Sequence, residues 1–120
     1  TVLHLVSTVE GELPDTLNAV DILKSCFPGG SVTGAPKLRS MQIIEALEPV
    51  RRGVYCGAIG YISFSGDMGT SIAIRTMVLV QNTVYLHLGG AIVVDSDPTS
   101  EYLETLQKGA GIRDALSYAC

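Results

Sequence analysis

The strongest constraint on the fold is a stretch rich in glycine and proline, FPGGSVTGAPK, which occupies residues 27–37. Its three glycines and two prolines exclude the interior of a helix or of a central strand. Amphipathic patterns flank the stretch on both sides, so we predict a shaped loop that leads into a helix. Pro36 suits the first turn of that helix, and Ser31 or Thr33 is the expected N-cap residue.

A nucleotide-binding P-loop is the obvious alternative for this stretch. Gly29 and Gly34 have the spacing of the P-loop glycines. A P-loop then continues with Lys and Ser or Thr, whereas this chain continues with Ala35-Pro36-Lys37. The hydroxyl that would bind Mg²⁺ is therefore missing, and the proline removes a backbone N–H donor, so we reject the P-loop.

Charge and hydrophobicity limit the class of partner. A net charge of −4 and a sequence pI near 4.9 argue against binding to nucleic acid or to an anionic membrane surface. No apolar run is long enough to span a membrane, and the first residues are not expected to form a signal peptide. Hydrophobic residues make up 47% of the chain, which is high for 120 residues. Either the chain is a well-packed domain, or its apolar surface meets a partner or a second copy of itself.

The cysteines carry information about the cellular compartment. Cys26, Cys56 and Cys120 are odd in number and widely spaced, which fits neither a set of disulfides nor a zinc site. We expect reduced, mostly buried thiols and a cytoplasmic protein.

Hydrophobic periodicity and turn signals predict the secondary structure. Turns are expected at Ser65-Gly66-Asp67 and at Gln81-Asn82. The predicted elements are a strand at 2–10, helices at 15–26 and from the loop to about residue 48, strands at 54–64, 70–80, 84–88 and 91–94, and a helix at 97–118. This order, with hairpins in place of alternating βα units, predicts an α+β fold with an antiparallel β-sheet flanked by helices.

Four glycines interrupt these predicted elements. Gly57 and Gly60 lie inside a predicted strand, where glycine marks the close approach of another backbone or a ligand. Gly109 and Gly111 lie inside the last helix and each costs about 1 kcal/mol relative to alanine. We expect that helix to fray there unless tight packing requires small residues.

One face of the last helix carries three charged side chains. Glu101, Glu104 and Lys108 are spaced by three and four residues, so they project from the same side. Such a trio is commonly a solvated face with a Glu104–Lys108 ion pair. It also suits a Mg²⁺ site, because this cation takes one or two protein carboxylates together with oxygens of a substrate and water.

Two other features are able to bind an anion. Arg75 follows small residues on a predicted strand, and a guanidinium group can hold a carboxylate through two hydrogen bonds. Gly89-Gly90-Ala91 is a short segment whose backbone amides could cradle a carboxylate. From pattern alone, however, a single strand arginine is more often an ordinary surface residue.

Aromatic and histidine side chains have weaker signals. Tyr55 is typical of a half-buried core aromatic residue, and a single histidine on a strand, such as His4, is usually structural. His87 is expected on the surface of a hairpin. Lys37 is expected in the first turn of a helix and turned towards solvent.

The glycine- and proline-rich stretch also resembles a signature of the chorismate-binding family, which includes anthranilate synthase component I and aminodeoxychorismate synthase component I. The likeness is stronger to the second type. Further stretches resemble the same family in the same order: HLVSTVEGEL, RRGVYCGAIGYISF, TSIAIRT, GGAIVVDSDP and EYLETLQK. Catalytic domains of this family are longer than this chain. The resemblance therefore implies that residues 1–120 are the C-terminal portion of such a domain, with the family's antiparallel α+β fold.

The resemblance also implies roles for individual residues. Glu104 falls at the position of a metal-ligating glutamate, with Glu101 beside it, and the implied metal is Mg²⁺. His4 matches a histidine near the reacting ring, which would donate a proton or orient the substrate. The family usually has a third glycine where Ala91 stands, and alanine would be strained there if its φ were positive. The implied substrate-binding residues are Ser31, Tyr55, Arg75, Gly89, Gly90, Ala91 and Lys108.

The implied activity is the Mg²⁺-dependent amination of chorismate to 4-amino-4-deoxychorismate, in the para-aminobenzoate branch of folate biosynthesis. The chain would contribute to it as part of a longer enzyme, and a glutamine amidotransferase subunit would supply ammonia. Anthranilate synthase component I, in tryptophan biosynthesis, is the alternative. A third interpretation is a non-catalytic fragment, because an isolated chain would lack one metal ligand.

Overall fold

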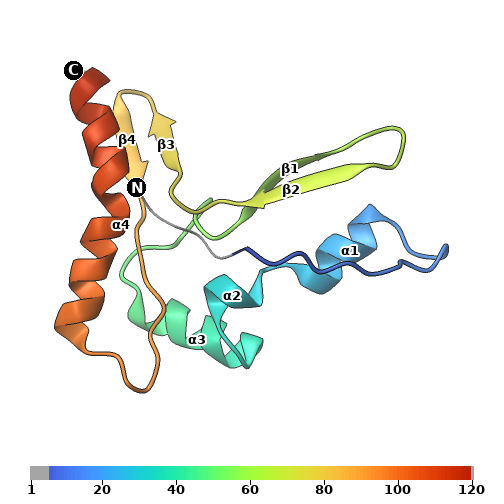
Figure 1. Cartoon of the computed structure of the whole chain (residues 1–120), viewed down its shortest axis with the longest axis horizontal. Helices are drawn as coiled ribbons and strands as arrows, with labels where there is room; N and C mark the ends of the chain where they lie inside the picture. Colours follow the sequence, from blue (N-terminus) through green and yellow to red (C-terminus); the bar gives the residue numbers. More distant parts are fainter. Residues whose placement is uncertain (1–5, 120) are drawn as a thin grey trace.

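The computed structural model describes residues 6–119 of the chain (Figure 1). The arrangement is α+β with antiparallel strands, which confirms the predicted class, and the strands form two separate two-stranded sheets. His4 lies outside the described residues. The elements are α1 (Ala19–Cys26), α2 (Gly30–Thr33), α3 (Lys37–Leu47), β1 (Ala58–Ile62), β2 (Met68–Ile72), β3 (Met77–Val80), β4 (Thr83–Leu86) and α4 (Pro98–Ala119).

Both hairpins are antiparallel and have the expected turns. β1 pairs with β2 from Ala58↔Ile72 to Ile62↔Met68, and β3 pairs with β4 around the turn at Gln81-Asn82. The strand predicted at 70–80 is divided between the two hairpins. Arg75, at φ 51°, has a left-handed backbone that a strand cannot continue through.

The first predicted elements are shorter than expected. Residues 6–10 are exposed and form no strand with any described residue, so that part of the predicted strand at 2–10 is wrong. α1 begins at Ala19, not at residue 15, because Asn18 and Asp21 form a capping box. The Asn18 side chain accepts a hydrogen bond from the Val20 N–H at 2.9 Å, and Asp21 accepts one from the Asn18 N–H at 3.1 Å.

The glycine- and proline-rich stretch contains a helical turn that the sequence patterns missed. This turn is α2, and it includes both residues that were predicted to cap the next helix, Ser31 and Thr33. The Thr33 hydroxyl donates to the Gly29 carbonyl at 3.0 Å, so it supports α2 and does not cap α3. Pro36 occupies the N-cap position of α3, one residue before its first turn. Lys37 is half-buried, not turned to solvent as predicted.

Two other predicted strands are also corrected. β1 starts at Ala58, because the residues before it form tight turns in which the Gly57 N–H donates to the Val54 carbonyl at 2.9 Å. Residues 91–94 are exposed and form no strand. Gly60 confirms the prediction of close approach, since a Cβ there would lie 2.8 Å from the Cα of Thr70 on β2.

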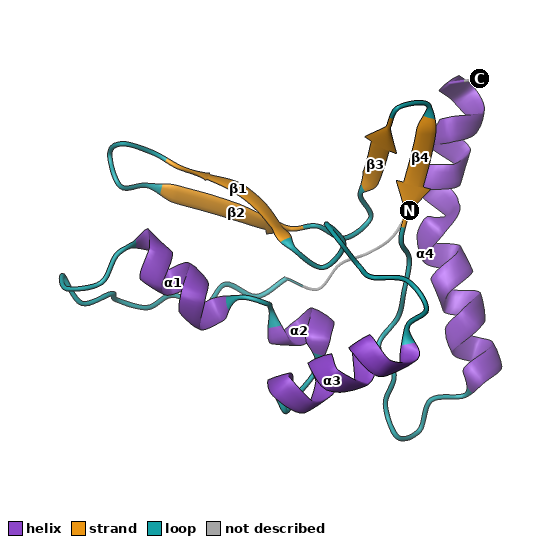
Figure 2. Cartoon of the chain, turned by 180° about the vertical axis from the view of Figure 1, so that it is seen from behind, coloured by secondary structure: helices purple, strands orange, loops and turns teal. Residues whose placement is uncertain are grey.

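α4 is continuous through both of its glycines, so the expected fraying does not occur. Gly109 is buried against the side chain of Leu88, and a Cβ at this position would overlap Leu88. Figures 1 and 2 show α4 running beside the β3–β4 hairpin, while the β1–β2 hairpin extends away from it. No helix in the described part of the chain is long and apolar enough to cross a membrane.

Very little of the described chain is buried. The buried hydrophobic side chains are Cys56 and Ala73, whose backbones are linked by a hydrogen bond from the Cys56 N–H to the Ala73 carbonyl at 3.0 Å. Of the two cysteines in the described residues, Cys26 is exposed and Cys56 is buried, so the prediction of mostly buried thiols holds for one of them, and Cys120 lies outside the described residues.

The accessible surface is 10193 Å², whereas a folded protein of this mass exposes about 6,200 Å². The radius of gyration is 17.0 Å against about 13.6 Å for a compact domain of this length. Large apolar side chains such as Tyr61 and Leu79 are about two-thirds exposed. These values contradict the well-packed alternative and favour an apolar surface that meets further protein.

Candidate functional site

Gly89 and Gly90, which follow β4, are the point at which the predicted site residues meet. A Cβ on Gly89 would lie 2.8 Å from the hydroxyl oxygen of Tyr55. A Cβ on Gly90 would lie 3.2 Å from Glu101 Oε2, 3.7 Å from Glu104 Oε1 and 3.8 Å from Lys108 Nζ. Glycine leaves room for these side-chain ends at both positions, and neither residue has a positive φ.

Two carboxylates and one ammonium group of α4 face Gly90. Lys108 Nζ forms an ion pair with Glu104 Oε1, as the four-residue spacing predicted. Glu101 is half-buried and accepts a hydrogen bond from the Ser96 hydroxyl at 2.5 Å, which fixes its orientation. The carboxylates therefore converge on one side of the helix, and the ammonium group partly balances their charge.

This donor set fits part of a Mg²⁺ site. Mg²⁺ is commonly held by one or two protein carboxylates, with substrate oxygens and water completing the shell. Glu101 and Glu104 supply two carboxylates beside Gly90. Residues 6–119 contain no group of three His, Cys, Asp or Glu side chains arranged to hold a metal ion, so further oxygen ligands would have to come from outside this range.

Tyr55 is the aromatic residue of this cluster, which consists of Tyr55, Gly89, Gly90, Glu101, Glu104 and Lys108. Its ring stacks on the ring of His87 with a centroid separation of 5.4 Å, and the guanidinium carbon of Arg52 lies 5.6 Å from its centroid. Burial is the main cause that raises the pKa of the Tyr55 phenol above its ordinary value of 10.0. His87 is therefore half-buried at the site, which corrects its predicted place on the hairpin surface.

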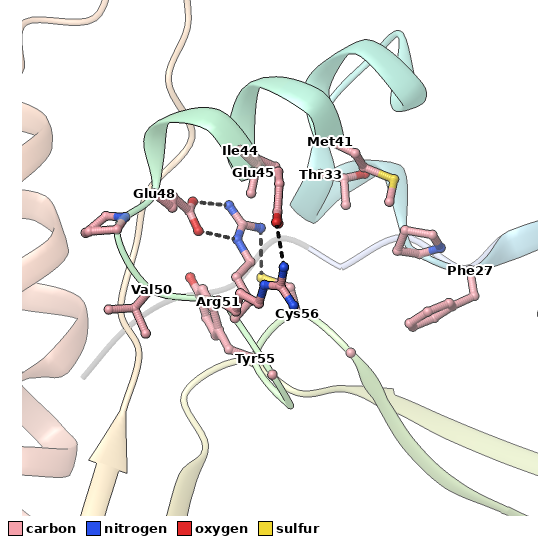
Figure 3. A pocket seen from close by; sticks show the side chains of 15 residues that line it. Phe27, Thr33, Met41, Ile44, Glu45, Glu48, Val50, Arg51, Tyr55 and Cys56 are labelled. Atoms are coloured by element: carbon pink, nitrogen blue, oxygen red, sulfur yellow. Dashed lines mark hydrogen bonds and ion pairs between the residues drawn. The ribbon is translucent and has the colours of Figure 1, made fainter.

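Tyr55 also lines a cavity of about 470 Å³ beneath α3 (Figure 3). None of the lining residues belongs to α4 or to the Gly89–Gly90 segment, so the cavity and the carboxylates are connected through Tyr55. The carboxylates and the ammonium group converge beside Gly90 and not in the cavity, so the cluster is the candidate functional site. The cavity lining includes Phe27, Pro28, Met41, Ile44, Glu45, Glu48, Val50, Arg51, Arg52, Tyr55 and Cys56.

Several predicted residues are not joined to the cluster. Arg75 lies in an exposed loop between β2 and β3, not on a strand, and makes no hydrogen bond or ion pair within residues 6–119. Ser31 is exposed on α2, and no contact links it to Gly90. Ala91 is exposed, and its φ is not positive, so the condition under which alanine would be strained there is not met. His4 lies outside the described residues.

Three residues of the site were not predicted from the sequence. The Ser96 hydroxyl donates a hydrogen bond to Glu101, His87 stacks on Tyr55, and the Arg52 guanidinium lies over the Tyr55 ring. Only Arg52 carried a signal, because it follows Glu48 by four residues near the end of a predicted helix. Hydrophobic periodicity does not predict contacts between segments that are far apart in the chain.

The chain belongs to the family of chorismate binding enzymes, whose family model matches residues 1–114. Aminodeoxychorismate synthase component 1 of Salmonella typhimurium is 56% identical to it over 105 residues, and that of Escherichia coli is 53% identical over 105 residues. Each alignment covers 88% of this chain and 23% of the relative.

Anthranilate synthase component 1 of Acinetobacter calcoaceticus is 47% identical over 115 residues, covering 96% of this chain and 23% of the relative. The chain thus spans about a quarter of the length of the curated relatives that it matches. The predicted family is confirmed, and both of its predicted branches are present among the relatives.

Proposed function

We propose that this chain is the C-terminal portion of a chorismate-binding catalytic domain, and that the complete protein aminates chorismate to 4-amino-4-deoxychorismate. The observation that carries the proposal is the convergence of Tyr55, Glu101, Glu104 and Lys108 on the Gly89–Gly90 segment. The relatives named aminodeoxychorismate synthase component 1 support the choice of reaction.

The cluster provides what a doubly anionic substrate requires. Lys108 supplies a positive charge, and Gly89 and Gly90 have no side chains of their own to keep a ligand away from their backbone amides. We propose that the two glutamates hold Mg²⁺, which when bound would offset the negative charge of the substrate and of its departing hydroxyl group. Glu101 is pre-oriented for this role by Ser96, so less conformational freedom is lost on binding.

The remaining sequence-predicted residues belong to the proposal as well. Arg75 is exposed, so its guanidinium group is available for a substrate carboxylate, and Ser31 is an exposed residue of α2. We propose that they complete the substrate site together with Ala91, and that His4 donates a proton to the substrate or orients it. These assignments rest on the family resemblance of the surrounding motifs.

The exposed apolar surface supports the proposal of a partial domain. The described chain exposes about 4,000 Å² more than a compact protein of its mass, and we propose that the rest of the polypeptide covers this surface. The same segment would supply the missing metal ligands. We further propose that a glutamine amidotransferase subunit supplies ammonia, and that the protein is cytoplasmic, since Cys26 and Cys56 are free thiols.

Anthranilate synthase component I is the second candidate, because relatives with that name are 47–51% identical to the chain. The two reactions differ in the ring position that receives nitrogen. The cluster around Gly90 would serve either reaction, so the product must decide between them.

The test is chorismate turnover by the full-length protein with Mg²⁺ and ammonium, with products separated by chromatography and identified by mass spectrometry. 4-Amino-4-deoxychorismate supports the proposal, and anthranilate replaces it with the second candidate. A folded full-length protein that binds chorismate but forms neither product would contradict both.

A further inference from the structure

Arg52 uses its whole guanidinium group in contacts inside the protein. Nε donates to Glu48 Oε2 at 2.9 Å and Nη2 donates to Glu48 Oε1 at 2.6 Å, which is a bidentate ion pair at the end of α3. Hydrogen bonding to Glu48 is the main cause that raises the pKa of Arg52, and the same bond lowers the pKa of Glu48. The pair therefore holds the arginine in one orientation.

The third guanidinium nitrogen of Arg52 reaches two other segments. Nη1 donates to the carbonyl oxygen of Val32 in α2 at 3.0 Å and contacts Cys56 Sγ at 3.4 Å. The Arg52 guanidinium carbon also lies 5.6 Å from the Tyr55 ring centroid. One side chain thus connects the end of α3, the helical turn of the glycine- and proline-rich stretch, and the turns before β1.

Arg51, the preceding residue, makes far fewer contacts than Arg52. It forms one ion pair, with Glu45 at 3.2 Å, and its side chain is 88% exposed. The Arg52 side chain is only 22% exposed and its contacts span twenty residues of sequence. Exposed pairs such as Arg51–Glu45 contribute little, so Arg51 is a matched control.

The contacts continue from Arg52 to the cluster. The Tyr55 ring contacts both the Arg52 guanidinium and the His87 ring, and its hydroxyl lies against Gly89. We propose that Arg52 is a positioning residue: it holds Tyr55 and α2 in the arrangement that receives the substrate, without touching the substrate itself. This inference rests on the proposed function.

The kinetic test compares Arg52→Met and Arg52→Lys with Arg51→Met in the full-length protein. Both Arg52 variants are expected to lower kcat/KM for chorismate by about 10- to 100-fold, because a small displacement of binding groups is costly. The loss should fall mainly on KM, whereas Arg51→Met should match the wild type. Lysine cannot replace the arginine because one ammonium group cannot serve Glu48 and Val32 in the same planar geometry.

Arg52→Ala provides a readout that a merely structural role would not change. Added guanidinium ion should restore part of the lost kcat/KM in Arg52→Ala and not in Arg51→Ala. Wild-type KM in a folded Arg52→Met protein, or the absence of any rescue, would overturn the proposal.

A second measurement does not depend on turnover. The protein is labelled with 3-fluorotyrosine, and the ¹⁹F signal of position 55 is assigned with Tyr55→Phe. Arg52→Lys is expected to shift this signal, and Arg51→Lys is not. An unchanged signal would overturn the positioning role even if the enzyme is active. An inactive wild type with a shifted signal would instead refute the proposed function alone.

Discussion

The rings of Tyr55 and His87 stack with an interplanar angle of 25°, although the two residues are 32 positions apart in the chain. Tyr55 precedes the first hairpin and His87 follows the second. The contact therefore joins the two ends of the segment that contains both hairpins, and it presents the Tyr55 hydroxyl to Gly89.

Removing that hydroxyl should weaken substrate binding. Tyr55→Phe keeps the ring stack and is expected to raise KM for chorismate about three- to tenfold, the range for one lost hydrogen bond. Steady-state kinetics of the full-length protein measure the effect. Tyr85→Phe is the control, since Tyr85 lies on β4 with half of its side chain exposed. Equal KM values for both variants would remove Tyr55 from the substrate site.

The proposed metal site predicts a specific loss of activity. Glu104→Gln should reduce Mg²⁺-dependent turnover of the full-length protein about 100-fold or more, because several kcal/mol of charge stabilisation disappear. Circular dichroism should show unchanged folding. Asp114→Asn, an exposed carboxylate on the same helix, is the control. Normal turnover of Glu104→Gln at all Mg²⁺ concentrations would exclude Glu104 as a ligand.

The Glu48–Arg52 pair should make stability depend on pH in the acid range. The hydrogen bond from Arg52 lowers the pKa of Glu48 from its ordinary value of 4.5. Its contribution is therefore fully present above pH 4.5 and is lost as the pH falls through the lower pKa of the folded state. Because 39% of the Glu48 side chain is exposed, the contribution is at most about 1 kcal/mol.

Thermal unfolding of wild type and Glu48→Gln between pH 7 and pH 3 measures this contribution. The difference in Tm should shrink as the pH falls below 4.5, because Glu48 of the unfolded state binds its proton first and Glu48 of the folded state only at its lower pKa. Glu45→Gln should show little difference at any pH, since its ion pair is highly exposed. A Tm difference for Glu48→Gln that is constant across this range would contradict the assignment.

The Tyr55 phenol should lose its proton at a higher pH than an ordinary tyrosine. Burial raises its pKa above 10.0, so the folded state favours the neutral phenol. The stability linked to this group is fully present below pH 10.0 and is lost as the pH rises through the higher pKa of the folded state. Ultraviolet titration of wild type and Tyr55→Phe isolates the signal. A phenol that titrates at or below pH 10.0 would show that Tyr55 is not buried in the full-length protein.

Two glycines in α4 should respond differently to alanine. Gly111 has no atom near the position of an added Cβ, so Gly111→Ala should stabilise the protein by about 0.5–1 kcal/mol. Gly109→Ala gains the same helix propensity, but the added Cβ would displace the Leu88 side chain that packs there. Urea unfolding should therefore rank Gly111→Ala above Gly109→Ala. The reverse order would show that Leu88 does not pack against α4.

Local sequence patterns determined most of the secondary structure of this protein and the family to which it belongs. The turns, the helical character of α1, α3 and α4, and the shared face of Glu101, Glu104 and Lys108 all follow from periodicity, capping and spacing of nearby residues. The family could be predicted as well, because its motifs are contiguous stretches in a fixed order.

Tertiary structure decided where those pieces meet. A left-handed backbone at Arg75 divides one predicted strand into two hairpins, and nothing in the sequence pattern marks that break. Gly90 meets α4, Tyr55 meets His87, and Arg52 reaches Val32 across twenty residues. Such contacts depend on how separate segments pack, which short-range periodicity does not encode. The sequence therefore determined the chemical groups of the site, and only the packing decided which of them lie together.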